Sequence, residues 1–236
     1  MRLEGRVAVV VGASSGVGLA VARAFAAEGA RVHALARRAE LIERTDRIFS
    51  GRLDVTNERA VASLFAALGD MDIVVYAAGT NVKNRRLAEL DDAGWRTMVE
   101  TNLSGAVHVM RAALPALRRR RGQAVLIASV SGRWPDASGP GYQATKAGVR
   151  ALAHGLAFEE HTSGVRVCAI LPGAIDTPLI DKRPTVPAPE LRAKMLRAED
   201  VAAACLFVVT LRPEAYVPEL VILPTALQAI GSDLGR

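Results

Sequence analysis

The sequence is poor in aromatic residues and in cysteine. Phe, Trp and Tyr make up 4% of the 236 residues while half of the chain is hydrophobic, so a core must be built from aliphatic side chains, mostly Ala, Val and Leu. The two cysteines, Cys168 and Cys205, each stand in an apolar run, VCAIL and ACLFVV. That setting is typical of reduced, buried thiols, and it predicts neither a disulfide framework nor a CxxC site.

Long apolar runs are also absent. The longest uncharged stretch, residues 7–22, contains three glycines and two serines, whereas a membrane-spanning helix needs about 20 apolar residues. Arg2 and Arg6 before this stretch and Ala20-Val21-Ala22 at its end imitate a signal peptide, but GASSG interrupts the apolar part after its first strand-like run. We therefore expect a cytoplasmic protein that does not associate with a membrane.

The surplus of positive charge comes almost entirely from arginine. The formal net charge is +6, from 26 Arg and 4 Lys against 24 acidic residues, and such a surplus is one signature of nucleic-acid binding. The densest basic cluster, residues 118–121, stands at the end of a predicted helix, where cations complement the helix dipole, and no aromatic residues interleave with it. We expect no nucleic-acid partner. The four histidines are dispersed without metal-ligand spacing, so no metal site is expected.

Short β-branched runs alternate with helical patterns along the chain. A length of 236 residues suits one α/β domain and is too short for two ordinary enzymatic domains. Because the strands read as continuous apolar runs, we predict a doubly wound parallel sheet of about seven strands with helices on both faces, in a single domain over residues 1–236. Strands are predicted at residues 7–11, 31–35, 47–53, 72–79, 124–129, 165–171 and 219–223, and the main helices at 57–68, 94–117, 141–160 and 199–211 and from the first glycines to residue 28.

One segment, residues 173–198, breaks this alternation. It contains four prolines and the charged triplet Asp181-Lys182-Arg183. It is too rich in proline for a sheet strand and too long for a tight turn, so we expect a lid over a site. The cations Lys182 and Arg183 suit a carboxylate substrate, while the apolar residues of the lid suit a neutral ketone equally well. Trp134, Leu179 and Ile180 are either pocket-lining or packing residues.

A glycine-rich turn follows the first predicted strand. The sequence VGASSGVG places Gly12, Gly16 and Gly18 in a GxxxGxG spacing before a helix. Glycine permits close approach, and the N–H groups and positive end of the helix attract an anion, to which Ser14 and Ser15 add hydroxyl donors. This position in an alternating α/β chain favours a dinucleotide phosphate site, with tight strand-to-helix packing as the alternative role of the glycines.

The end of the second strand indicates which dinucleotide binds. In folds of this class an acidic residue there binds the ribose 2′-hydroxyl, while a cation accommodates a 2′-phosphate. The strand ends LARR, with Ala36 at the expected acidic position followed by Arg37 and Arg38. Because one charge-assisted contact contributes about 1.5–3 kcal/mol, NADP is favoured over NAD. In the alternative interpretation, both arginines are solvated loop residues.

Tyr142 and Lys146 form a YxxxK pair one helical turn apart, so the phenol and the ammonium share a helix face. A cation within about 4–6 Å lowers the pKa of a phenol from about 10 toward the range useful for proton transfer. Thirteen residues earlier in the chain, Ser129 ends a predicted strand at the carboxyl edge of the sheet, where open α/β proteins bind ligands. We expect its hydroxyl to hold a substrate oxygen, with a backbone-capping role as the alternative.

Taken together, these motifs resemble those of the short-chain dehydrogenase/reductase family. The resemblance implies a single-domain Rossmann fold and an NADP(H)-dependent oxidoreductase that interconverts a carbonyl and a secondary alcohol by hydride transfer. It covers nearly the whole chain, in the family's order and spacing, with VGASSGVG after the first strand, LDVT at 53–56, AAG at 77–79, TNL with Asn102, Ser129, YQATK at 142–146 and PGAIDT at 172–177.

The resemblance also implies a role for each motif residue. Tyr142 is implied as the acid/base, Lys146 as the cation that lowers its pKa and binds the nicotinamide ribose, Ser129 as the residue that orients the reacting oxygen, and Asn102 as support for a proton-relaying water chain. The implied cofactor-binding residues are Gly12, Ser14, Ser15, Gly16, Val17 and Gly18 in the glycine turn, Arg37 and Arg38, Asp54 and Val55 at the adenine, Ala78 and Gly79 at the ribose, Tyr142 and Lys146, and Pro172, Gly173, Ile175 and Thr177 at the nicotinamide end.

The sequence departs from the family pattern at a few positions. Val11 replaces the usual Thr before the glycine turn, and Tyr76-Ala77 replace the usual Asn-Asn pair, so two structural hydrogen bonds of the pattern are absent. The carboxyl end reads YVPELVILPT instead of the glycine-rich ending common in the family, and it resembles a subgroup similar to 3-hydroxy acid dehydrogenases. This ending does not assign a substrate beyond a small carbonyl or alcohol.

Two other functions share parts of this pattern. A non-catalytic NADP-sensing or scaffold protein would have the same fold, but we would expect its Ser/Tyr/Lys set to be broken, whereas here the set is intact. An epimerase or dehydratase with tightly held NAD usually needs a longer substrate domain than 236 residues leave room for. The resemblance further implies a homo-oligomer, a tetramer or dimer, formed through the helices predicted at 94–117 and 141–160.

Overall fold

A single sheet of seven parallel strands forms the centre of the computed structural model, which describes residues 1–227. Residues 228–236 of the predicted domain lie outside the described part of the chain. The strand order is β3-β2-β1-β4-β5-β6-β7, and every pairing is parallel, as predicted. The strands are β1 (Val7–Val11), β2 (Arg31–Ala36), β3 (Ile48–Arg52), β4 (Ile73–Tyr76), β5 (Gln123–Ile127), β6 (Arg166–Pro172) and β7 (Glu219–Ile222).

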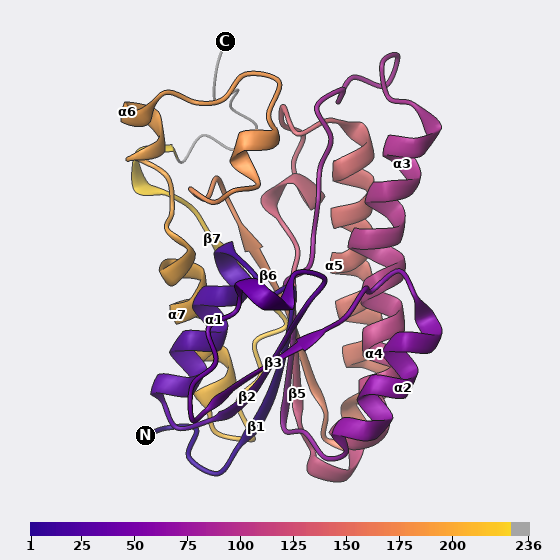
Figure 1. Cartoon of the computed structure of the whole chain (residues 1–236), viewed down its shortest axis with the longest axis vertical. Coiled ribbons are helices and arrows are strands. Elements are labelled where there is room, and N and C mark those ends of the chain that lie inside the picture. The colour runs from indigo at the N-terminus through magenta and orange to yellow at the C-terminus, as the bar shows by residue number, and fades with distance from the viewer. Residues whose placement is uncertain (228–236) are drawn as a thin grey trace.

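Helices cover both faces of the sheet, which confirms the predicted architecture. The chain winds outward from β1 to β3 and then crosses back to β4, so the strand order reverses between β1 and β4. In a doubly wound sheet, ligands bind beyond the carboxyl ends of the strands at such a point. Figure 1 shows α1 (Gly16–Ala27), α6 (Pro189–Arg192) and α7 (Ala198–Thr210) on one side, and α2 (Glu58–Leu68), α3 (Asp92–Met98), α4 (Gly105–Arg120) and α5 (Pro140–Glu160) on the other.

The strands are apolar throughout because they are buried on both faces. In β1, Ala8 and Val10 belong to the core under α1 and α7, while Val9 and Val11 belong to the core under α2, α4 and α5. All four side chains are at most 1% exposed. A strand with one solvated face would alternate apolar and polar residues instead. The sequence pattern therefore predicted the layers correctly.

The long helix predicted at 94–117 is interrupted in the structure. It begins at Asp92 as α3, passes through a π-helical segment (Val99–Ser104), and continues as α4 to Arg120. The hydroxyl of Tyr76, at the end of β4, donates a hydrogen bond to the carbonyl of Thr101 in this segment. Tyr76, which departs from the family pattern, thus supplies a structural hydrogen bond of its own. π-Helical turns inside α-helices are frequent at functional sites.

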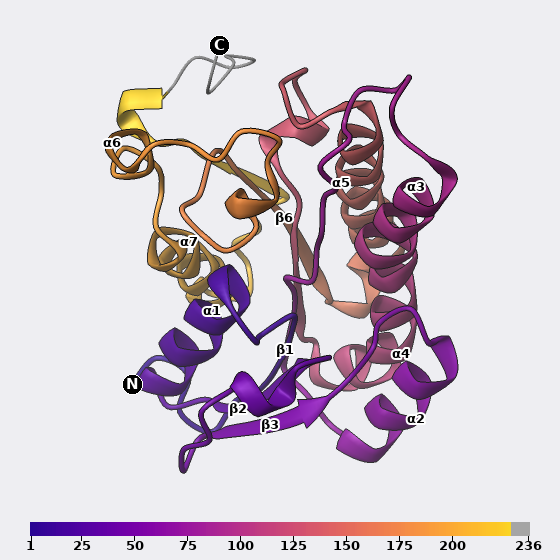
Figure 2. The ribbon, with the colours of Figure 1, turned by 45° about the horizontal axis from the view of Figure 1, so that its top comes forward.

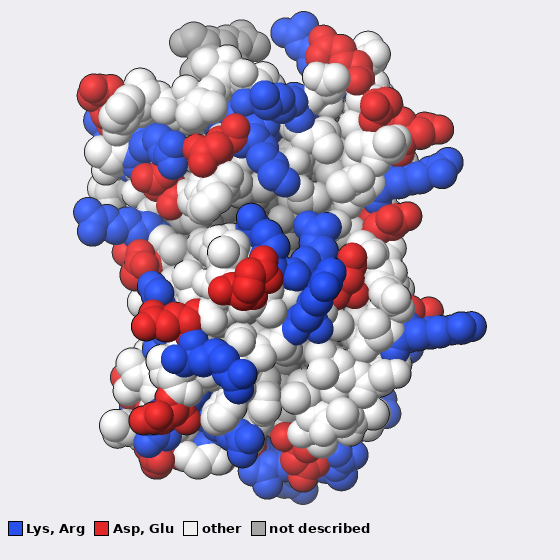
Figure 3. Space-filling view, in the orientation of Figure 1, with Lys and Arg blue, Asp and Glu red and all other residues white. Residues whose placement is uncertain are grey.

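The basic cluster at the end of α4 is largely neutralised by acids. Arg118, Arg119 and Arg120 form ion pairs with Glu160, Asp70 and Asp72. Figure 3 shows acidic and basic side chains interspersed over much of one face of the molecule, with basic side chains gathered around a hollow. Within residues 1–227, no helix has both the length and the apolar character of a membrane span.

Candidate active site

A cavity of about 940 Å³ opens at the carboxyl ends of the strands. Residues that follow β1, β2, β4, β5 and β6 line it, so it lies where the strand order reverses. Its volume is near the upper end of the range for ligand pockets, which suits a dinucleotide together with a small substrate. Figure 2 shows the segment between β6 and α7 on one side of this edge and the loops after β4 and β5 on the other.

The turn between β1 and α1 forms one end of the cavity. Gly12 has a φ of +89°, and a Cβ added there would lie 2.5 Å from the backbone nitrogen of Ala78. A Cβ on Gly18 would lie 2.3 Å from the carbonyl oxygen of Gly12. Packing alone therefore requires these two glycines. Gly16 differs, because it lines the cavity and has a φ of +53° opposite Thr177.

The first turn of α1 faces the cavity without a side-chain cap. Ser15 is the N-cap residue, its side chain makes no capping hydrogen bond, and the first turn contains no acidic residue. Ser14, Ser15, Gly16 and Val17 line the cavity at this point. Backbone N–H groups of an uncapped helix end and nearby hydroxyls fit the pyrophosphate of a dinucleotide. The residues present thus fit the implied cofactor.

Arg37 and Arg38 follow β2 and lie exposed at the rim of the same cavity. Neither forms an ion pair with any residue in 1–227. Arg52, at the end of β3, also lines this part, and Glu40 is the acidic residue there. The rim beside β2 therefore presents more positive than negative charge, as an anionic ligand requires.

Of the two residues predicted at the adenine, Val55 lines the cavity and Asp54 does not. Val55 is buried and lines the cavity. Asp54 is exposed and is not part of the cavity wall, because its carboxylate accepts hydrogen bonds from the backbone N–H and the hydroxyl of Thr56, at 3.0 and 2.9 Å.

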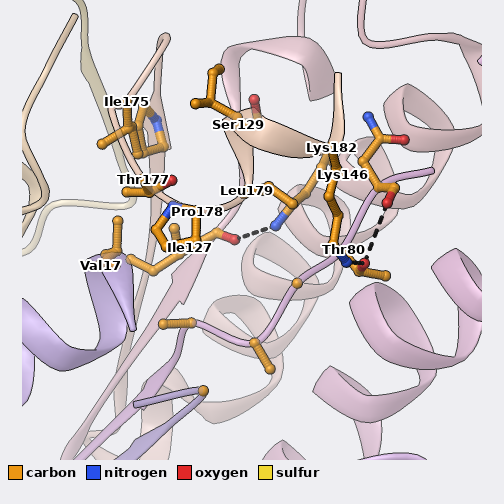
Figure 4. A pocket seen from close by; sticks show the side chains of 18 of the residues that line it. Val17, Thr80, Ile127, Ser129, Lys146, Ile175, Thr177, Pro178, Leu179 and Lys182 are labelled. Atoms are coloured by element: carbon orange, nitrogen blue, oxygen red, sulfur yellow. Dashed lines mark hydrogen bonds between the residues drawn. The ribbon is translucent and has the colours of Figure 1, made fainter. Parts of the chain in front are cut away.

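Tyr142 and Lys146 lie on consecutive turns of α5, buried at the cavity wall. The Lys146 ammonium donates a hydrogen bond to the carbonyl of Ile127, 2.8 Å away at the end of β5 (Figure 4), and lies 5.8 Å from the centre of the Tyr142 ring. Ser129, two residues beyond β5, lines the same cavity and lies near enough to the Tyr142 hydroxyl to act on its pKa in the lowering direction. The three side chains predicted from separate motifs are therefore together.

Close backbone contact brings Ser129 to this helix. Ser129 caps a short 3-10 turn (Val130–Gly132), where its Oγ accepts a hydrogen bond from the backbone N–H of Ser131 at 3.2 Å. A Cβ on Gly132 would lie 2.6 Å from the carbonyl carbon of Lys146. Glycine therefore lets this turn rest directly on α5. Ser129 thus caps the backbone and also lines the cavity. The backbone-capping role therefore does not prevent its hydroxyl from holding a substrate oxygen.

The pKa of Tyr142 lies above that of a free phenol, opposite to the expected effect of Lys146. Burial, and then the charge of Asp136, raise it to about 12, although the hydrogen bond with Ser129 and the charges of Arg85 and Arg183 act in the lowering direction. Burial lowers the pKa of Lys146 to about 8. The Lys146 ammonium is directed to the carbonyl of Ile127. Tyr142 is thus a neutral phenol at neutral pH.

Asn102 lies behind the cavity wall, fully buried in the π-helical segment. Its Oδ1 accepts a hydrogen bond from the backbone N–H of Thr80 at 2.7 Å, and its Nδ2 donates to the carbonyl of Thr80 and the hydroxyl of Thr145, each at 3.0 Å. A Cβ on Gly79 would lie 3.4 Å from Lys146 Nζ and 3.6 Å from Asn102 Oδ1. Asn102 therefore joins the loop after β4 to α5 beside Lys146.

A hydrogen-bonded chain behind Ser129 was not indicated by any motif. Ser129 Oγ donates to Ser131 Oγ at 3.1 Å, and Ser131 Oγ donates to the carboxylate of Asp136. The same carboxylate accepts hydrogen bonds from the backbone N–H and hydroxyl of Ser138 and from the amide of Gln143. Asp136 is therefore held in one position near Tyr142, in a loop with no regular periodicity.

Residues of the predicted lid, 173–198, lie over the cavity. Lys182 Nζ donates a hydrogen bond to the hydroxyl of Thr80 at 2.7 Å (Figure 4), and Arg85 Nη2 donates to the carbonyl of Lys182 at 3.1 Å. Both contacts join the lid to the loop after β4. Arg85 was missed at the sequence level, because nothing distinguishes it from Arg86 beside it. Trp134, Leu179 and Ile180 line the cavity.

Most of the residues expected from the sequence meet at this cavity. Gly18, Asp54 and Asn102 lie outside its wall, with the structural roles given above. The predicted residues that line it are Gly12, Ser14, Ser15, Gly16, Val17, Arg37, Arg38, Val55, Ala78, Gly79, Ser129, Tyr142, Lys146, Pro172, Gly173, Ile175 and Thr177. Among the described residues, no cluster of His, Cys, Asp and Glu that would hold a metal ion is present.

The chain is similar to characterised dehydrogenases over most of its length. It is 36% identical to cis-4-hydroxycyclohexanecarboxylate dehydrogenase of Sinomonas cyclohexanicum, over 86% of this chain and 88% of that protein. A serine dehydrogenase in a closed form with NADP+ has 31% sequence identity and a TM-score of 0.87, over 98% of this chain and 99% of the other. A 3-ketoacyl-(acyl-carrier-protein) reductase of Brucella melitensis in complex with NADH has 27% identity and a TM-score of 0.86, over 94% and 98% of the two chains.

The family assignment follows from the match of sequence, fold and site. Residues 6–186 match the short chain dehydrogenase family, and this span contains the glycine turn, Ser129, Tyr142, Lys146 and the first part of the lid. The seven-stranded Rossmann sheet agrees with the solved structures of similar sequence. The chain belongs to the short chain dehydrogenase family and is an oxidoreductase of that family.

Proposed function

We propose that the protein is an NADP(H)-dependent oxidoreductase that interconverts a carbonyl and a secondary alcohol by hydride transfer, with Tyr142 as the acid/base. The observation that carries this proposal is that Ser129, Tyr142 and Lys146 meet at the wall of one cavity, whose other end is the uncapped first turn of α1. Proton transfer and dinucleotide binding are thereby combined in one cavity.

Each residue of this set has a distinct task. A bound nicotinamide cofactor supplies the hydride in reduction and accepts it in oxidation. The neutral phenol of Tyr142 donates a proton to the carbonyl oxygen in reduction, and its phenolate takes the alcohol proton in oxidation. Ser129 holds the same substrate oxygen. Lys146 binds the cofactor ribose, and Asn102 supports proton relay by fixing the backbone of Thr80.

NADP preference rests on Arg37 and Arg38. Both lie at the rim beside the end of β2, the position at which a dinucleotide fold recognises the 2′-group of the adenosine ribose. A 2′-phosphate would neutralise these exposed cations, whereas a 2′-hydroxyl would not. Since similar structures contain NADP+ in one case and NADH in another, the arginines, more than the fold, support the choice of NADP.

The proposal includes homo-oligomer formation and a cytoplasmic location. Phe158 on α5 is 79% exposed, and Trp95 on α3 is 41% exposed, on the side of the molecule where the resemblance implies subunit contact. A second copy would cover these apolar side chains. Cys168 and Cys205 are free and buried, which is compatible with a reducing compartment. Light scattering after gel filtration measures the oligomeric state.

Cofactor oxidation tests the proposed function. The purified protein is mixed with NADPH and a panel of ketones, keto acids and quinones, and the loss of absorbance of the reduced nicotinamide is followed. We expect turnover of at least one carbonyl class, with NADPH used more efficiently than NADH. Binding of NADPH without turnover across the whole panel would instead favour a non-catalytic NADP-binding protein.

A further inference from the structure

Arg85 is a cation at the cavity that forms no ion pair with any of the described residues, 1–227. Its side chain lies in the cavity wall and the residue is 9% exposed. Nε donates to the carbonyl of Val82 at 2.9 Å and Nη2 to the carbonyl of Lys182 at 3.1 Å. These acceptors are neutral, and within residues 1–227 Arg85 takes part in no ion pair. Residues 1–227 supply no hydrogen-bond acceptor for its Nη1.

A second cation, Arg183 of the lid, lies near Arg85 and makes the charge of Arg85 harder to accommodate. Arg183, in the lid, lies near enough to lower the pKa of Arg85, in addition to the lowering caused by burial. Tyr142 and then Asp136 act in the opposite direction on the pKa of Arg85. The Asp136 carboxylate already accepts hydrogen bonds from Ser131, Ser138 and Gln143. A partly buried cation beside a like charge is stabilised when an anion binds between them.

The position of Arg85 is fixed relative to Tyr142. A Cβ on Gly139, which has a φ of +90°, would lie 2.4 Å from the carbonyl oxygen of Arg85, so the two backbones are in direct contact. Gly139 immediately precedes α5, and Tyr142 lies in the first turn of that helix. Arg85 and Arg183 also both lower the pKa of Tyr142. Both cations therefore lie close enough to the reacting hydroxyl for their charges to act on it.

The cations at the adenosine end of the cavity form a separate group. Lys182 donates a hydrogen bond to the hydroxyl of Thr80, and burial, followed by the charges of Arg37 and Arg38, lowers its pKa. The pKa of Arg85 is lowered by burial and then by the charge of Arg183. A dinucleotide phosphate accounts for Arg37 and Arg38. It does not account for Arg85, whose charge acts on Tyr142. Trp134 and Leu179 supply apolar surface to the same cavity, and such surface suits a short hydrocarbon body.

We propose that Arg85, assisted by Arg183 of the lid, binds the carboxylate of the substrate, so that the enzyme oxidises small hydroxy acids and reduces the corresponding keto acids. This inference rests on the proposed function, since it places the carboxylate relative to the carbon that Tyr142 serves. The carboxylate binds the cations as an ion pair, and the apolar residues hold the carbon skeleton. Neutral ketones of the same shape bind the same cavity without this contact.

Equilibrium binding tests the inference without requiring turnover. The probes are cyclohexanecarboxylate and its primary amide, titrated by calorimetry into the wild-type protein with and without saturating NADPH. We expect the carboxylate to bind about 10- to 100-fold more tightly than the amide, the ratio that one charge-assisted contact provides. Equal binding of the two probes, or no binding of the carboxylate, would overturn the inference.

Variants then locate the contact. Arg85→Met removes the charge and keeps the stem, and Arg86→Met is the matched control, because Arg86 is exposed in the same loop and outside the cavity. We expect R85M to abolish the carboxylate preference, R85K to keep part of it, and R86M to leave it unchanged. If R85M weakens carboxylate and amide equally, Arg85 holds the lid and does not bind substrate, and the inference fails.

Kinetics separate this inference from the proposed function. 4-Oxocyclohexanecarboxylate and its methyl ester are compared as substrates with NADPH, alongside the carbonyl panel. We expect a higher kcat/KM for the acid, lost in R85M, while kcat/KM for the ester changes by less than about twofold, since no charged contact is removed. Turnover of neutral carbonyls with no preference for acids refutes the carboxylate site alone. Selective carboxylate binding without any turnover refutes the proposed function alone.

Discussion

The Lys182 ammonium lies 2.7 Å from the hydroxyl of Thr80 and joins the lid to the loop after β4. Together with the hydrogen bond from Arg85 to the carbonyl of Lys182, it holds the lid over the cavity. If this segment acts as the predicted lid, we expect its opening to be part of the catalytic cycle. Local stability of the lid is therefore a measurable property with a functional consequence.

Lys182→Met should loosen the lid without unfolding the protein. Loss of one hydrogen bond of about 1 kcal/mol raises the open population about fivefold, so amide hydrogen exchange in residues 173–198 should be faster by about that factor. Lys194→Met is the control, because Lys194 is exposed in the same segment and makes no side-chain hydrogen bond with residues 1–227. Equal exchange in K182M and K194M would show that Lys182 does not hold the lid.

Tyr142→Phe should remove turnover while leaving cofactor binding intact. Loss of a positioned acid/base costs about 10²- to 10⁴-fold in kcat, and NADPH affinity, measured by fluorescence titration, should change little. Tyr216→Phe is the matched control, since that hydroxyl bonds the carbonyl of Val167 outside the cavity wall. Near-normal activity of Y142F would refute the role of Tyr142.

Alcohol oxidation should accelerate as the pH rises. The pKa of Tyr142 is about 12, so the phenolate that accepts the alcohol proton becomes more abundant toward that value. The negative charge of Asp136 is the second cause of this elevation. Asp136→Asn removes that charge, which favours the phenolate and lowers the pKa of Tyr142.

The pH dependence of kcat/KM for oxidation in D136N should therefore shift to lower pH than in the wild type. Asp70→Asn serves as the control, because Asp70 pairs with Arg119 at the surface and lies outside the cavity. An unchanged profile, or a shift to higher pH, would show that the charge of Asp136 does not act on Tyr142.

Arg37→Ala should weaken NADP(H) binding much more than NAD(H) binding. A charge-assisted contact with the 2′-phosphate corresponds to about 10- to 100-fold in affinity, and NAD(H) has no such phosphate. Arg44→Ala is the control, as Arg44 is exposed and outside the cavity wall. Comparable losses for both cofactors would mean that Arg37 does not select between them.

Gly132→Ala should reduce both stability and activity. Its Cβ would lie 2.6 Å from the backbone of Lys146, which forces the Ser129 turn away from α5; strain of this kind costs about 1–3 kcal/mol. Gly155→Ala on the same helix has nothing within 4 Å of the new Cβ and should stabilise by about 0.5–1 kcal/mol. Thermal denaturation compares the two, and a G132A protein as stable and active as G155A would contradict the packing argument.

Patterns of short range account for what the sequence predicted well. The continuously apolar strands predicted burial on both faces of the sheet. The YxxxK spacing predicted that Tyr142 and Lys146 share one face of α5. Both patterns follow from the local periods of strand and helix. The helix predicted at 94–117 was less accurate. Its π-helical interruption contains Thr101, whose carbonyl accepts a hydrogen bond from Tyr76 at the end of β4, a contact between segments far apart in the sequence.

The sequence by itself determined the layers, the family and most of the predicted side chains that line the cavity. Only the tertiary structure decided that Asp136 raises the pKa of Tyr142, that Lys146 turns to Ile127, and that Arg85 stands between the lid and Tyr142. The physical reason is that charge interactions depend on distance and burial in space. No spacing along the chain encodes the distance between Arg85 and a tyrosine on another element.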